Sequence, residues 1–229
     1  MTSSSVPRGK SLAAIFMNRQ DAGEQLAQAV WSAITLLSPD ERLPCVVYAL
    51  PKGGLPIAEL IARQLGCPLT ILVAKKITAP SNRELAIGAV TADGQVIWAG
   101  NMPRSLEVNR GQALHQAQQQ ARLQQAQFLA VHPGYRAEGA IALVVDDGIA
   151  TGMTMAAAVQ SLRAQGAAQV WICAPVAPLD LMPSLRSLCD RVLVLATPTP
   201  FYSVGRFYQA FPQVSMEEAL ECLQRSLLA

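Results

Sequence analysis

The chain has 229 residues, of which 51% are hydrophobic and 15% charged, and its formal net charge is +2. This length and composition fit one large hydrophobic core, so we expect a single domain over residues 1–229. The small net charge, without a basic block, gives no support for nucleic acid as a partner. No apolar run approaches the roughly 20 residues of a membrane span, and the five cysteines follow no disulfide or metal spacing. We therefore expect a cytoplasmic protein with reduced thiols and no membrane partner.

Short runs rich in Val, Ile and Leu alternate with helical patterns along most of the chain. This alternation predicts an α/β fold class with a doubly wound, five-stranded parallel sheet, in which ligands bind at the carboxyl ends of the strands. Residues 45–75 and 139–197 would form this core. The predicted strands are 45–50, 69–74, 140–145, 169–174 and 191–196, and the crossover helices are 57–65, 154–165 and 181–188.

Two parts of the chain fall outside the alternation. Residues 76–130 predict an inserted flexible β-arm, because strand-like pieces at 85–91 and 95–98 flank an Ala-Asp-Gly hairpin signal, and a Gln-rich helix over 105–129 follows. Amphipathic helices at 21–37 and 215–228 would pack together as a cap. Residues 1–40 and 198–229 would thus supply a small hood.

Residues 141–154 place two carboxylates, Asp146 and Asp147, between an apolar strand and an Ala-rich helix. The loop that opens the helix offers backbone N–H groups and hydroxyls where a phosphate binds readily. Carboxylates repel a phosphate, so they would face ribose hydroxyls, Mg²⁺ or a developing positive charge. An ordinary Asp-Gly turn before a capped helix is the alternative. The predicted phosphate-binding residues are Ala150, Thr151, Gly152, Met153 and Thr154.

A second strand-to-helix loop follows the first strand and contains Lys52, Gly53 and Gly54, which let a ligand approach the backbone closely. Two such loops at adjacent strand ends suggest a ligand with phosphates at both ends. Lys75 and Lys76, beside the arm, would add positive charge for a diphosphate. A plain Gly-Gly turn with solvated lysines is the alternative.

Residues 198–211 gather aromatic side chains beyond the last predicted strand. Aromatic rings there would stack on a planar base, with Phe201, Tyr202 and Val204 as the base-binding residues and Arg19 and Arg206 facing it. The alternative is an aromatic cluster that seals the core.

Residues 144–154, Val-Val-Asp-Asp-Gly-Ile-Ala-Thr-Gly-Met-Thr, resemble the phosphoribosyl diphosphate (PRPP) motif of type I phosphoribosyltransferases. The resemblance implies catalytic roles for Asp146 and Asp147. It also implies a Mg²⁺ ion that is held mainly by PRPP and has no direct protein ligand, with Asp146 contacting the ion through a water molecule. The Lys-Gly-Gly loop is similar to the diphosphate loop of hypoxanthine-guanine members, which implies a cis peptide at Pro51–Lys52.

The same resemblance implies transfer of the 5-phosphoribosyl group from PRPP to a nitrogenous, purine-like base with release of diphosphate, in nucleotide salvage. A homodimer is the default expectation for a fold of this kind. The chain departs from the oxopurine members, because Ala150 replaces an acid and residues 195–197 lack a lysine. Gln209 and Ala210 stand where the family has an acid. These departures leave open a non-catalytic PRPP- or nucleotide-binding regulator. A phosphate-ester hydrolase would need a second Asp two residues after its nucleophile, and that spacing is missing.

Overall fold

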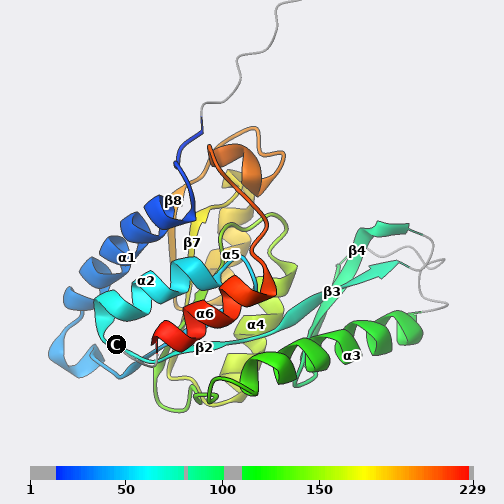
Figure 1. The fold of residues 1–229 in the computed structure, drawn as a ribbon, viewed down its shortest axis with the longest axis horizontal. Coiled ribbons are helices and arrows are strands. Elements are labelled where there is room, and N and C mark those ends of the chain that lie inside the picture. Colours follow the sequence, from blue (N-terminus) through cyan, green and yellow to red (C-terminus); the bar gives the residue numbers. More distant parts are fainter. Residues whose placement is uncertain (1–13, 80–81, 101–109, 227–229) are drawn as a thin grey trace, which may run out of the picture.

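The computed structural model describes residues 14–79, 82–100 and 110–226, and its core is a five-stranded sheet in the order β2-β1-β6-β7-β8 (Figure 1). All four strand pairs are parallel, so the predicted doubly wound fold class is confirmed. Every residue of the central strand, β6 (Ile141–Val145), is buried, as expected for a strand covered on both faces. The strands are β1 (Cys45–Ala49), β2 (Leu69–Ile71), β6 (Ile141–Val145), β7 (Gln169–Val176) and β8 (Arg191–Ala196).

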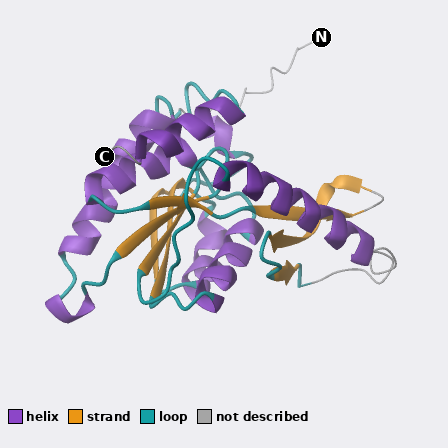
Figure 2. Cartoon of the chain, turned by 60° about the horizontal axis from the view of Figure 1, so that its bottom comes forward, coloured by secondary structure: helices purple, strands orange, loops and turns teal. Residues whose placement is uncertain are grey.

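Helices cover both faces of this sheet (Figure 2). Helices α1 (Arg19–Thr35), α2 (Leu55–Leu65) and α6 (Met216–Ser226) share one hydrophobic cluster with one face. Helices α4 (Met153–Ala164) and α5 (Met182–Leu188) cover the other. We expected the first and last helices to pack together, but each packs mainly against α2. They therefore belong to the helical layer of the sheet.

The inserted arm is a three-stranded antiparallel sheet of β3 (Ala74–Ala79), β4 (Asn82–Thr91) and β5 (Val96–Trp98), with α3 (Arg110–Leu129) packed on it (Figure 1). The first of these strands was not predicted. The core strand expected over 69–74 ends at Ile71, and the chain then pairs with β4 instead. Residues 80–81, and residues 105–109 of the predicted Gln-rich helix, lie outside the described residues.

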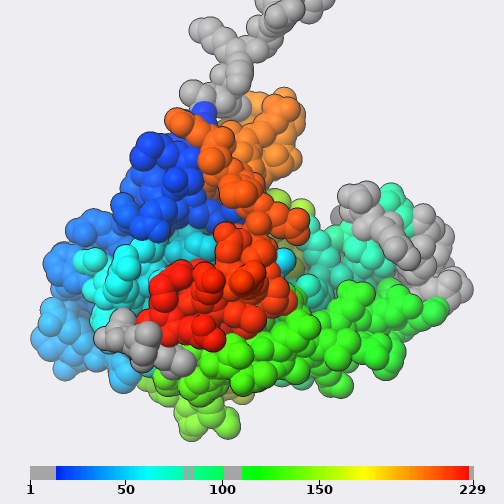
Figure 3. Space-filling model, in the orientation of Figure 1, coloured from blue at the N-terminus to red at the C-terminus, as the bar shows by residue number. Residues whose placement is uncertain are grey.

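The hood joins segments from the two ends of the described chain. The backbone N–H groups of Ile15 and Phe16 both donate to the Phe207 carbonyl, and Gln209 N–H donates back to the Phe16 carbonyl. Figure 3 shows the resulting contact between the blue and orange surfaces at the upper part of the molecule. The described residues also contain the short 3-10 helices η1 (Pro39–Glu41), η3 (Leu179–Leu181) and η4 (Val204–Phe207).

Within the described ranges, no helix has the length and apolar character that crossing a bilayer requires.

Candidate active site

The loop between β6 and α4 encloses a small cavity of about 110 Å³ at the carboxyl edge of the sheet. Gly152 precedes the helix with a φ of +74°, a conformation that side-chain-bearing residues rarely adopt. This turn lets the chain enter the helix with its first N–H groups near the cavity. Of the predicted phosphate-binding residues, Ala150, Thr151, Gly152 and Thr154 line the cavity, whereas Met153 does not line it and begins α4.

Asp146 and Asp147 lie side by side where β6 ends. The N–H of Asp147 donates to Oδ1 of Asp146 over 2.9 Å. Burial, and then the charge of Asp147, raise the pKa of Asp146 well above its usual range. Burial also raises the pKa of Asp147, although the Arg19 guanidinium acts against that rise. The pair therefore concentrates negative charge that a cationic or electron-poor ligand group would stabilise.

Arg19, in the first turn of α1, contacts Asp147 directly. Its Nε and Nη2 atoms lie 2.9 Å and 2.7 Å from the same carboxylate atom, Oδ2. Its Nη1 donates to the Pro212 carbonyl over 2.6 Å, and its guanidinium carbon lies 3.7 Å from the centre of the Phe211 ring. The hood therefore fixes a cation on the acid pair, an arrangement that the sequence, which placed Arg19 near a base, did not reveal.

The loop after β1 reaches the acid pair from the neighbouring strand. The Pro51–Lys52 peptide is cis, as the resemblance implied. A Cβ atom at Gly53 would collide with Oδ2 of Asp147, and one at Gly54 would collide with the carbonyl oxygen of Val145. Because no side chain fits at either position, both glycines are required for this close approach.

The two lysines that were grouped from the sequence lie in different surroundings. Burial, and then the positive charge of Lys52, lower the pKa of Lys75, so Lys52 lies close enough to Lys75 to act on it electrostatically. Lys76 instead lines the cavity of the β6–α4 loop, together with Thr151 and Thr154. Successive residues of a strand project to opposite faces, which explains the separation. The sequence assigned both lysines to the diphosphate, and Lys76 lies beside four of the residues predicted to bind a phosphate, Ala150, Thr151, Gly152 and Thr154.

A larger cavity, of about 750 Å³, separates the phosphate loop from the hood. Phe201 and Tyr202 line it from the hood, and Ala150 and Thr151 line it from the loop. Val204, the third residue predicted to contact a base, is not among the lining residues and packs against Gly148 instead.

Tyr208 is a functional candidate that sequence reasoning missed. Its hydroxyl donates to the backbone carbonyl of Asp147 over 2.6 Å. Its ring packs against Phe16 and Phe211, with centroids 5.4 Å and 4.7 Å away. Tyr208 thereby fixes the backbone of the acid pair to the hood.

Comparison with known proteins places this fold and site in a family. The model of the phosphoribosyl transferase domain matches residues 20–195, and the chain belongs to that family. Two curated relatives from Mycobacterium tuberculosis, strains CDC 1551 and H37Rv, are named provisionally as phosphoribosyl transferases. Each is 36% identical over 217 residues, which cover 93% of this chain and 47% of the relative. The chain thus spans about half the length of the curated relatives it matches.

Two solved structures share the fold. TT1426 from Thermus thermophilus has 31% sequence identity and a TM-score of 0.74, and the match covers 92% of this chain and 98% of that one. AQ2163 from Aquifex aeolicus has 11% identity and a TM-score of 0.51, covering 83% and 85% of the two chains. The second likeness concerns the fold alone.

Proposed function

We propose that this protein transfers the 5-phosphoribosyl group of PRPP to a nitrogenous base and releases diphosphate. The observation that carries the proposal is the position of the acid pair, Asp146 and Asp147, against both strand-to-helix loops. Asp146 lines the cavity of the β6–α4 loop, Gly53 lies against Asp147, and the charge of Lys52, beside Gly53, acts on Lys75. PRPP carries its phosphate groups at opposite ends of a ribose, so it matches this order of charges.

Each element has a distinct role in this reaction. The N-terminus of α4 and the hydroxyls of Thr151 and Thr154 bind the 5′-phosphate. Asp146 and Asp147 hold the ribose hydroxyls and stabilise the positive charge that develops on the ring as the bond from C1 to diphosphate breaks. Lys52, with the backbone N–H groups of the glycine loop, stabilises the departing diphosphate.

Mg²⁺ is part of the proposal, and the donor set fits it. The ion prefers oxygen ligands and retains several waters, and Asp146 offers a carboxylate that would reach it through water. Among the described residues, no group of three or more His, Cys, Asp or Glu side chains is suited to hold a metal. We propose that the substrate's own oxygens carry most of the ion's coordination. When bound, it neutralises charge on the diphosphate.

The acceptor is proposed to be a planar, purine-like base that enters the cavity of about 750 Å³ and stacks on Phe201 or Tyr202. Ala150 occupies the cavity wall where oxopurine members carry an acid, so the chain's own contacts with the base are largely apolar. A homodimer acting in cytoplasmic nucleotide salvage completes the proposal, since symmetric dimers are the commonest oligomers. Light scattering of the purified protein measures the oligomeric state.

Calorimetric titration with PRPP, with and without Mg²⁺, tests the substrate, with ribose 5-phosphate as the matched ligand that lacks diphosphate. We expect metal-dependent binding of PRPP, followed by diphosphate release when the correct nucleobase is added. Tight binding without release for any base would favour the alternative, a PRPP- or nucleotide-binding regulator. Absence of binding to both ligands would refute both functions.

A further inference from the structure

We infer that Lys76 is a ligand of the 5′-phosphate, supplied to the phosphate loop by the inserted arm. This inference rests on the proposed function and assigns one more residue to its substrate. It also separates Lys76 from Lys75, its neighbour in β3, whose charge lies near Lys52.

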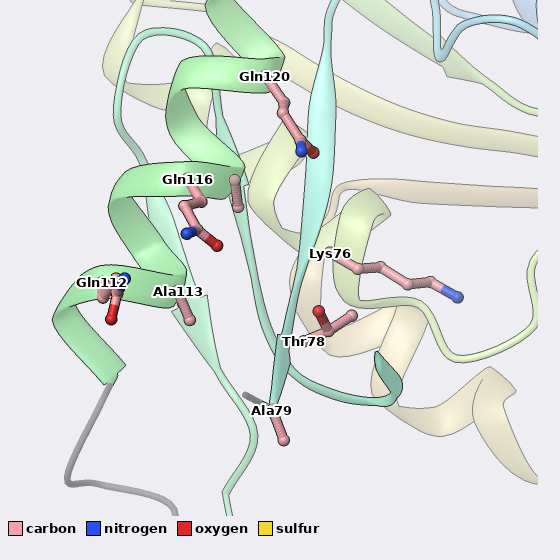
Figure 4. A pocket seen from close by; sticks show the side chains of 8 residues that line it. Lys76, Thr78, Ala79, Gln112, Ala113, Gln116 and Gln120 are labelled. Carbon is pink, nitrogen blue, oxygen red and sulfur yellow. The ribbon is translucent and has the colours of Figure 1, made fainter. Parts of the chain in front are cut away.

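The first argument is the position of the side chain. Lys76 borders the cavity of about 110 Å³ at the β6–α4 loop, and among the described residues it is the only cationic side chain that does so. In Figure 4, its amino group extends away from Gln112, Gln116 and Gln120 of α3, which line a separate groove that Lys76 also borders. Because Lys76 borders both cavities and its amino group points away from the groove, we assign the charged end to the phosphate cavity.

The second argument is electrostatic. A phosphate monoester carries between one and a half and two negative charges near neutral pH. Asp146 also lines the cavity that would receive it, and its side chain, when ionised, repels an anion. Helix N–H groups alone provide only about half a positive charge. A lysine at the rim supplies the missing charge as a charge-assisted hydrogen bond.

The third argument is the fixed attachment of the arm to the helix that begins at the phosphate loop. Asp93, in the turn between β4 and β5, accepts a 2.7 Å hydrogen bond from the buried Ser161 of α4. Arg122 of α3 donates to the adjacent Ala92 carbonyl over 3.1 Å. These contacts hold the arm sheet, and with it Lys76, against α4, with Ser161 in the last turn of that helix. The base of the arm therefore acts as a wall of the site.

Two ligands that each contain one end of PRPP provide the test. Calorimetry would compare ribose 5-phosphate and inorganic diphosphate on wild type, Lys76→Met and Lys75→Met. Methionine retains the length of the stem, and Lys76 is exposed, so the first variant is expected to keep its fold, which thermal unfolding would verify. We expect Lys76→Met to weaken the affinity for ribose 5-phosphate about tenfold or more. Its affinity for diphosphate should stay within about twofold of the wild-type value. Lys75→Met should show the opposite pattern, and Lys76→Arg should restore most of the lost affinity.

In steady-state assays, the loss in Lys76→Met should appear in KM for PRPP with kcat nearly unchanged, because the 5′-phosphate does not change during the reaction. If Lys76→Met weakens the binding of diphosphate instead, or weakens the binding of neither ligand, Lys76 does not bind the 5′-phosphate. In that case, PRPP turnover by the wild type would leave the proposed function intact. If the wild-type protein binds neither ribose 5-phosphate nor PRPP, the proposed function fails and this inference fails with it.

Discussion

Arg19 and Asp147, which are 128 positions apart in the sequence, form an ion pair in which two guanidinium nitrogens contact one carboxylate oxygen at 2.9 Å and 2.7 Å. Their side chains are only 11% and 14% exposed. Removing one member of a buried pair leaves the other charge without its partner. The pair thus contributes to stability as well as to the geometry of the site.

For Arg19→Gln, we expect the free energy of unfolding to fall by about 3 kcal/mol, as measured by urea titration. Arg163→Gln is the matched control, because Arg163 pairs with Asp190 over 3.3 Å while the two side chains are 45% and 37% exposed. That exposed pair should contribute no more than about 1 kcal/mol. Equal losses in the two variants would show that Arg19 does not stabilise the buried carboxylate.

The raised pKa of Asp146 predicts a pH-dependent effect on stability. Because its pKa is higher in the folded protein than in the unfolded chain, the folded state retains the proton in the interval between the two values, and stability falls as pH rises through that interval. Asp146→Asn removes this titration. The variant should therefore unfold at a higher temperature than wild type at pH 8, and the difference should shrink as pH falls toward 4. A gap that is constant with pH would contradict the raised pKa.

The contact between Gly53 and Asp147 predicts that Gly53→Ala disrupts the diphosphate loop, because the new methyl group would occupy the position of the carboxylate. We expect kcat/KM for PRPP to fall by about a hundredfold or more, as happens when one stabilising group is displaced. Gly111→Ala, on α3, meets no neighbouring atom within 4 Å and serves as the control. It should leave activity unchanged and stabilise the helix by about 0.5–1 kcal/mol. Full activity of Gly53→Ala would mean that the loop need not approach the acid pair.

The exposure of Tyr202, which is 68%, predicts that it acts on the acceptor and contributes little to folding. Tyr202→Ala should raise KM for the base at least about fivefold through lost stacking. Its unfolding free energy should change by no more than about 0.5 kcal/mol. Tyr135→Ala, at another exposed tyrosine that does not line the hood cavity, should leave KM unchanged. Similar KM values for the two variants would place the base elsewhere.

What could be predicted from the sequence depended on how local each signal is. The strand, acid pair and phosphate loop are contiguous over residues 141–154, so their composition indicated both structure and chemistry. That Lys75 and Lys76 lie in a strand of the arm was not predicted, because only Leu72 and Val73 separate the core strand from that strand, and the apolar pattern continues across the boundary. The Arg19–Asp147 pair could not be found, because no local pattern reports a contact between the first described helix and the middle of the chain.

The hood hydrogen bonds between residues 15–17 and 207–210 also set the order in which parts of the fold can form during synthesis. Synthesis proceeds from the N-terminus, so strands β1, β2 and β6 and the phosphate loop emerge from the ribosome while the partner of Phe16 is still missing. During that interval, Arg19 lacks both Phe211 and Pro212, the contacts that hold it over Asp147. A nascent chain therefore acquires its substrate loops first and its completed acid site last, after Pro212 has left the exit tunnel.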